Sequence, residues 1–152
     1  MFVDYLRGIW ENHILLSAVT AWFIAQFVKT IIHGTLNHEW RFERMWGSGG
    51  MPSSHSATVC ALVVATSYNY GPTSFEFTIA CLFAIIVIHD ARGVRLETGR
   101  QAEIINDIVQ YFRTKEPHMP LPEKELKELV GHTPIQVGAG MIIGVLTGIF
   151  LH

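Results

Sequence analysis

The side chains best suited to chemistry in this 152-residue chain are histidines and cations that flank apolar segments. His55 lies in the stretch GGMPSSHSAT, where two glycines, Ser53 and Ser54 precede an apolar run. This pattern predicts a helix that begins near Pro52, with free backbone amides that suit a phosphate group. His132 lies just before another apolar run. Two histidines with several cations favour attack on a phosphate ester, in which one neutral imidazole is the nucleophile and the second protonates the leaving alcohol.

Further polar residues lie at the ends of the apolar segments, and the candidate site includes five of them: Lys29, Arg41, Arg44, Asp90 and Arg95. Lys29 shares one helical face with Gln26, Thr30 and His33. Such a stripe faces a bundle interior, because a lysine at the bilayer centre costs about 2.5 to 3.5 kcal/mol; a snorkelling lysine is the alternative. Metal-assisted hydrolysis, with His89 and Asp90 among the ligands, is the competing chemistry. Because the sequence lacks a compact ligand motif such as H-E-x-x-H, we expect neither a metal nor another cofactor.

The composition indicates that a membrane-embedded helical bundle positions these residues. The chain is 49% hydrophobic and 16% charged, whereas an average soluble domain is about 25% charged. Four apolar segments are candidates to enter a bilayer, namely residues 13–33, 56–70, 75–89 and 135–151. We therefore predict an all-α integral membrane bundle with about four membrane-embedded helices, with a soluble all-helical bundle as the alternative. The net charge of -2 offers no case for nucleic-acid binding.

The distribution of basic residues predicts the orientation of such a bundle. If all four segments cross the membrane, residues 34–54 and 90–134 lie on the same side. Of the eleven Lys and Arg residues, all but Arg7 lie on or near that side. Basic residues accumulate on the cytoplasmic side of membrane proteins. We therefore expect a multi-pass protein of the cell membrane whose active site faces the cytoplasm.

The chain reads as one membrane-embedded domain, residues 1–152, with a polar insert at about 92–131. Apolar residues at helical spacing in this insert predict two amphipathic surface helices, at about 99–113 and 122–130. Three glycines recur every fourth residue in the last apolar segment: Gly140, Gly144 and Gly148. This face permits close helix packing within one chain, which we favour, or across a homodimer.

At these residues the sequence resembles the type 2 phosphatidic acid phosphatase superfamily, which includes lipid phosphate phosphatases and vanadium haloperoxidases, and in particular its divergent bacterial and plastid branch. The stretch PSSH (52–55) is similar to the superfamily's second block, P-S-G-H. HTPIQV with the following GAG (132–140) is similar to the tail of its third block, S-R-x5-H-x3-D. Four signatures of the divergent branch run in order over about residues 20–145: AQFVKT, GGMPSSHSA, DARGVRLETGRQAE and LVGHTPIQVGAG.

The resemblance implies a role for each matched residue. It makes His132 the phosphate nucleophile and His55 the general acid. The implied phosphate ligands are Lys29, Ser53, Ser54 and Arg95, with Arg41 or Arg44 in the place of the first-block arginine. The acid that orients the nucleophile in the superfamily is Gln136 in this chain, and Asp90 or Glu97 is the alternative source of that charge.

The sequence departs from the superfamily in its spacing. Eleven residues separate Lys29 from Arg41, where the superfamily has six, and the polar insert splits the third block. We expect a metal-independent phosphatase that acts on a lipid phosphomonoester or pyrophosphate, with phosphatidylglycerophosphate and phosphatidic acid favoured. The alternatives are a protein that binds or transports lipid phosphates without cleaving them, and a structural membrane subunit.

Overall fold

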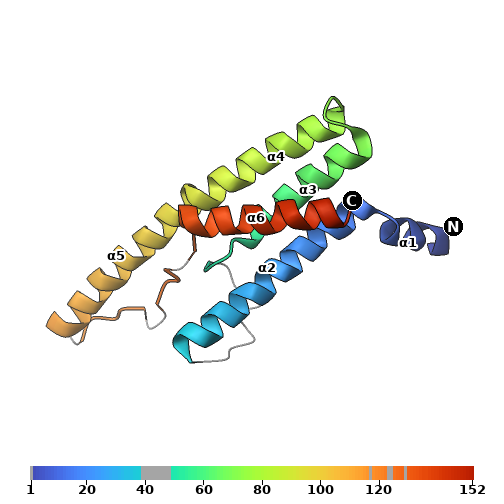
Figure 1. Ribbon diagram of the computed structural model, residues 1–152. Coiled ribbons are helices and arrows are strands. Elements are labelled where there is room, and N and C mark those ends of the chain that lie inside the picture. Colours follow the sequence, from blue (N-terminus) through green and yellow to red (C-terminus); the bar gives the residue numbers. More distant parts are fainter. Residues whose placement is uncertain (1, 39–48, 117, 123–124, 129) are drawn as a thin grey trace.

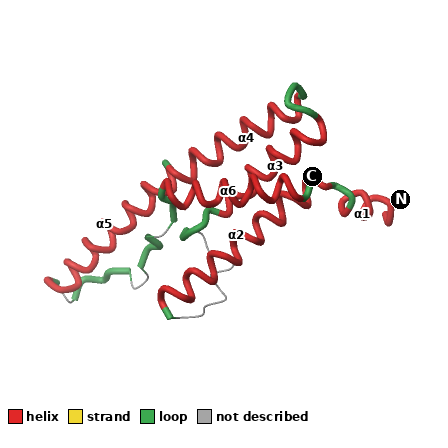
Figure 2. The backbone as a smooth tube through the Cα atoms, viewed as in Figure 1, coloured by secondary structure: helices red, strands yellow, loops and turns green. Residues whose placement is uncertain are grey.

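The computed structural model describes residues 2–38, 49–116, 118–122, 125–128 and 130–152, and these residues form helices and no strand. The helices are α1 (Phe2–Trp10), α2 (His13–Asn37), α3 (Ser54–Tyr70), α4 (Phe75–Arg92), α5 (Val94–Lys115) and α6 (Pro134–Phe150). Figure 1 shows α2, α3, α4 and α6 gathered into a bundle, while α1 and α5 extend beyond it. The all-α prediction is confirmed, and α2, α3, α4 and α6 cover the four predicted apolar segments (Figure 2).

Polar side chains cap the starts of these helices. Asn12 accepts a hydrogen bond from a first-turn amide of α2, and Ser74 does so at α4. Ser53 is the N-cap of α3, and its hydroxyl accepts from the Ser56 amide. The helix itself begins at Ser54, so Pro52 precedes the cap and does not lie in the first turn as predicted. The caps satisfy amides that the helices leave without internal partners.

Helix α3 is the centre of the bundle, since it packs against α2, α4 and α6. Four alanines form the core between α2 and α3: Ala21, Ala25, Ala57 and Ala61. Because alanine side chains are short, the two helix axes approach closely, as small residues allow in membrane bundles. The core therefore depends on close backbone contact more than on large apolar side chains.

The glycine face of α6 packs against α3 of the same chain. A Cβ atom at Gly140 would overlap the carbonyl oxygen of Ser53, and one at Gly144 would overlap that of Ala57. At Gly148 a Cβ atom would lie 2.7 Å from the Cβ of Val64. The face is thus used inside one chain, the first of the two predicted alternatives. A homodimer through these glycines would have to displace α3, and dimerisation stays a prediction.

The outer surface of the bundle is rich in large apolar side chains. Helix α4 alone exposes Phe75, Ile79, Leu82, Phe83, Ile85 and Ile86, each by about half or more of its area. Two helical segments are long and apolar enough to cross a membrane, His13–Leu36 and Phe75–Lys115, and α6 is apolar but shorter. Only 17% of the apolar window in the second segment is buried. The core helix of a soluble protein would be mostly buried, so this surface favours a lipid environment.

The polar insert differs from the prediction. Helix α5 is longer than the expected 99–113, and the expected helix at 122–130 is wrong, because the described residues of that range are not helical. They belong to a return segment, defined as the described residues of 118–131, which lead back along α5 toward α6 (Figure 1). The Asn106 side chain donates to the Leu126 carbonyl and accepts from the Leu126 amide, both at 3.0 Å. These bonds replace the internal pairing of a helix.

Candidate functional site

Four distant parts of the chain meet at one end of the bundle: the C-terminal half of α2, the start of α3, the junction of α4 with α5, and the turn before α6 (Figure 1). Two backbone hydrogen bonds connect three of these parts. The Ser53 amide donates to the Gln136 carbonyl at 2.9 Å, and the His132 amide donates to the Ala91 carbonyl at 3.1 Å. The starts of α3 and α6 and the end of α4 are therefore held together by the backbone itself.

The two candidate catalytic histidines face each other across this meeting point. The ring centroids of His55 and His132 lie 6.1 Å apart, with the ring planes inclined by 59°. The two residues are 77 positions apart in the sequence (132 minus 55). At this separation one phosphate group that lies beside the two rings is close enough to contact both of them.

His132 is 1% exposed, and its Nδ1 atom has a defined partner. Its Nδ1 atom lies 3.3 Å from Oε1 of Gln136, and the Thr133 amide donates to the same Oε1 atom at 3.1 Å. A backbone amide can only donate, so the atom that it meets is the amide oxygen of Gln136. This oxygen is an acceptor and therefore favours the tautomer of His132 with its hydrogen on Nδ1 and its lone pair on Nε2. Gln136 thus favours the tautomer that a nucleophilic Nε2 requires.

The electrostatic environment keeps His132 neutral. Burial lowers the pKa of its imidazole below the ordinary value, and the charges of Lys29 and His55 act in the same direction. The hydrogen bond to Gln136 and a backbone contact with Gly50 oppose this shift. Because the pKa of His132 is lowered overall, its imidazole is neutral and carries a free lone pair at neutral pH, as a nucleophile must.

His55 lies in the first turn of α3, just before the apolar segment 56–70. Burial lowers the pKa of its imidazole, the charges of Arg95 and Lys29 lower it further, and the charge of Asp90 opposes them. Its Nδ1 atom is buried and has no hydrogen-bond partner among the described residues. A bound phosphate dianion beside this ring would reverse the electrostatic balance, because negative charge stabilises the protonated imidazole.

Lys29 contributes its positive charge from the buried side of the site. The residue is 4% exposed, which excludes the snorkelling alternative, and Gln26 and Thr30 on the same face are buried as well. Its side-chain stem lies beside Gly50, where an added Cβ atom would be 3.6 Å from Cγ of the lysine. Gly50 has a φ of +84°, a left-handed conformation that favours glycine. The two glycines before the motif thus let the chain turn closely over Lys29.

Asp90 and Arg95 form an ion pair across the junction of α4 and α5. The Arg95 Nε atom donates to Oδ2 of Asp90 at 2.6 Å, and both side chains are about 40% exposed. Asp90 therefore orients Arg95, whereas the orienting partner of His132 is Gln136. Glu97, the other alternative acid, pairs with Arg100 on the exposed surface.

The two serines of the motif lie at the start of α3 and are buried. The Ser53 hydroxyl accepts from the amide and the hydroxyl of Ser56, so it is occupied by capping. The amides of Ser54 and His55 belong to the first turn and have no partner within the helix itself. These amides are better placed than the Ser53 hydroxyl to contact a phosphate. Arg41 and Arg44 lie outside the described residues.

Sequence reasoning missed two features that shape the site. Thr133 and Gln136 form a capping box at the start of α6, and its pattern, T-x-x-Q before an apolar run, is visible in the sequence. Gly131 is the second feature, because an added Cβ atom there would overlap the backbone of Leu96 in α5. No sequence signal marks this contact, since it depends on how the return segment meets α5.

Replacing Gln136 by glutamate should raise the turnover of phosphate release by about tenfold or more, because a carboxylate stabilises the imidazolium that forms as Nε2 bonds to phosphorus. Glutamate also keeps the capping box.

The negative charge of the introduced carboxylate should also raise the pKa of His132. Since the neutral form is the nucleophile, the acid limb of kcat/KM should move to higher pH, whereas in the wild type it lies below about 6.5. Gln101→Glu on the exposed surface of α5 is the matched control. An unchanged or lower rate in Gln136→Glu would count against an orienting role.

Comparison with known proteins identifies the family of the chain. The model of the Divergent PAP2 family matches residues 10–147, which include α2, α3, α4 and α5 and most of α6. The chain is 36% identical over 148 residues to the uncharacterized membrane protein YuiD of Bacillus subtilis (strain 168), a match that covers 92% of this chain and 94% of the relative. No solved structure matches the chain. The chain therefore belongs to the Divergent PAP2 family, a conclusion that agrees with the resemblance carried by its histidine motifs.

Proposed function

We propose that this protein hydrolyses a phosphate ester on a membrane lipid, with His132 as the nucleophile and His55 as the general acid. The observation that carries the proposal is the pair of imidazole rings 6.1 Å apart, with the charge of Lys29 acting on both and that of Arg95 acting on His55. Gln136 supports it by directing the lone pair of His132 to Nε2.

The reaction has two balanced steps. First, the Nε2 lone pair of His132 forms a bond to phosphorus while the phosphorus–oxygen ester bond breaks, and the leaving oxygen takes the proton of His55. Second, a water molecule attacks the phosphohistidine, gives its proton to His55 and displaces the imidazole. Lys29, Arg95 and the amides at the start of α3 hold the phosphate oxygens. The products are the lipid alcohol and inorganic phosphate.

The membrane supplies the substrate in this proposal. We infer that α2, α3, α4 and α6 are all embedded in the bilayer, and that the site lies at the cytoplasmic end of the bundle. The excess of Lys and Arg at that end supports this orientation. Lipid phosphates made in the cytoplasmic leaflet, such as phosphatidylglycerophosphate or phosphatidic acid, are then the favoured substrates.

A binding protein that holds a lipid phosphate without cleaving it is the second candidate function. Gln136 favours it, because a neutral amide does not stabilise the imidazolium as a carboxylate would. The lowered pKa of His55 acts in the same direction, since a general acid must carry a proton. Both features weaken phosphoryl transfer, whereas the groups that would bind the phosphate, Lys29, Arg95 and the amides of α3, are unaffected.

Release of phosphate from a panel of purified lipid phosphates decides between the two functions. Purified protein should release inorganic phosphate from at least one cytoplasmic-leaflet lipid. The release should persist in EDTA, because the proposed mechanism uses histidine, lysine and arginine side chains and no metal ion. Saturable binding of these lipids without release would favour the binding protein. Loss of activity in EDTA that a divalent ion restores would contradict the histidine mechanism.

A further inference from the structure

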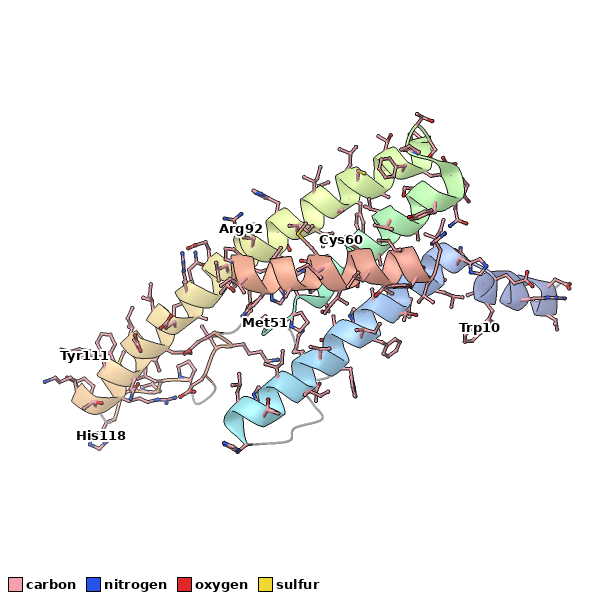
Figure 3. All side chains as sticks on the ribbon, viewed as in Figure 1. Trp10, Met51, Cys60, Arg92, Tyr111 and His118 are labelled. Carbon is pink, nitrogen blue, oxygen red and sulfur yellow. The ribbon has the colours of Figure 1, made fainter. Side chains whose placement is uncertain are left out.

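A cavity of about 510 Å³ lies near the histidine site and is bounded by α3, α4 and α6. It falls in the range of pockets that hold small molecules, about 300 to 1,000 Å³. Its walls are apolar and include Cys60, Val64, Cys81, Ile85, Met141 and Val145. Figure 3 shows Cys60 between the ribbons of α4 and α6. We refer to this cavity as the lateral groove.

The lateral groove is elongated along α4. Its lining on that helix extends from Cys81 to Arg92, eleven residues apart, which corresponds to about 16 Å of helix. One leaflet of a bilayer has a hydrocarbon layer of about 15 Å, half of the full core. Helix α4 also packs against α3 much more extensively than against α6, which leaves space between α4 and α6 over this length. The dimensions thus match one extended hydrocarbon chain.

The end of the groove nearest to the histidine site is polar. His89 and Arg92 line it there, and Figure 3 shows Arg92 near the junction of α4 and α5. Among the described residues, Arg92 forms no ion pair. An exposed guanidinium without a carboxylate partner complements an anionic headgroup. An apolar groove with a cation at one end matches the chemistry of an anionic lipid.

Residues that line the groove lie close to the candidate site along three helices. Asp90 and Ala91, which contact Arg95 and His132, lie in the same turn of α4 as Arg92. On α3, Cys60 follows His55 by five residues, and on α6 Met141 follows Gln136 by five, about 7.5 Å along each helix. A phosphate between the histidines would therefore lie about one and a half helical turns from the mouth of the groove.

We propose that the lateral groove binds one hydrocarbon chain of an anionic lipid, which Arg92 orients with its phosphate toward His55 and His132. This inference rests on the proposed function for the identity of the lipid as a substrate. It assigns the substrate class as a lipid with at least one long, straight chain.

Filling the groove should separate long-chain from short-chain substrates. Val145 lines the groove and is 38% exposed, so Val145→Trp places its added bulk in the cavity without entering the alanine core. Leu146→Trp is the matched control, because the neighbouring residue is 51% exposed and does not line the groove. Val145→Trp should raise KM for a long-chain phosphatidic acid by about tenfold. The kcat/KM for a dihexanoyl analogue should stay within about twofold of wild type, because its chains are too short to fill the groove. Equal effects of both substitutions on the long-chain substrate would overturn the proposal.

Alkylation of Cys81 tests binding without any requirement for catalysis. A Cys60→Ser variant leaves Cys81 as the single thiol, and its reaction with a maleimide can be followed in detergent. Long-chain phosphatidic acid should slow the reaction at least about fivefold in this variant, whereas the dihexanoyl analogue should not, and adding Val145→Trp should remove the lipid effect. Protection of Cys81 without phosphate release would contradict the proposed function but support lipid binding in the groove. Phosphate release without protection by long-chain lipid would contradict the groove alone.

Discussion

His132→Ala is expected to lower phosphate release by about 1,000-fold or more, because no covalent phosphohistidine can form without the Nε2 lone pair. The residue is almost fully buried between Gln136, the Ala91 carbonyl and the site, so no other described imidazole besides His55 approaches the same position. The rate is measured with the lipid that the panel identifies. In parallel, labelled phosphate is trapped on the wild-type protein as an acid-labile, base-stable adduct, which the variant should lack.

The control for this substitution is His13→Ala, which removes an exposed histidine at the opposite end of α2. His55→Ala provides the contrast, because removal of a general acid costs about 100- to 10,000-fold with a poor leaving group and much less with an aryl phosphate. His132→Ala should be inactive with both kinds of substrate. Retention of the adduct or of the rate in His132→Ala would show that another group attacks phosphorus.

Gly140→Ala is expected to destabilise the protein by about 1 to 3 kcal/mol, since the added methyl group overlaps the Ser53 carbonyl where α6 crosses the start of α3. The effect should lower the unfolding temperature in detergent by several degrees. Activity should also fall, because Ser53 caps the helix that carries His55 and its amide donates to the carbonyl of Gln136. The unfolding temperature and the rate of phosphate release are the two measurements.

The matched control is Gly138→Ala on the same helix, where an added methyl group meets no atom within 4 Å. There the change should be neutral or stabilising by about 0.5 to 1 kcal/mol, because alanine has less backbone freedom to lose than glycine in a helix. If the two variants unfold at the same temperature, the close contact of α6 with α3 does not contribute to stability.

The positions of the four apolar helices follow from the sequence, because hydrophobic composition and capping residues are local properties. Segments 13–33, 56–70, 75–89 and 135–151 each correspond to one helix, with ends that shift by up to four residues. The return segment differs from the predicted helix because its conformation depends on a contact with another part of the chain. Its apolar spacing suits a helix, but Asn106 of α5 pairs with the backbone of Leu126, a contact that no local pattern encodes.

The types of residue in the candidate site were also determined by the sequence alone, through the histidine motifs and the polar face of Lys29. Their geometry was decided by tertiary structure. Close packing at Gly140 and the bond from Ser53 to Gln136 hold the start of α3, which carries His55, against the start of α6, which follows His132. The side-chain pairs inside the site are short-range, since Gln136 follows His132 by four residues and Arg95 follows Asp90 by five. Residue type, helix formation and these short-range pairs are local properties of the chain, whereas the approach of His55 to His132 depends on helix contacts between residues far apart in the sequence.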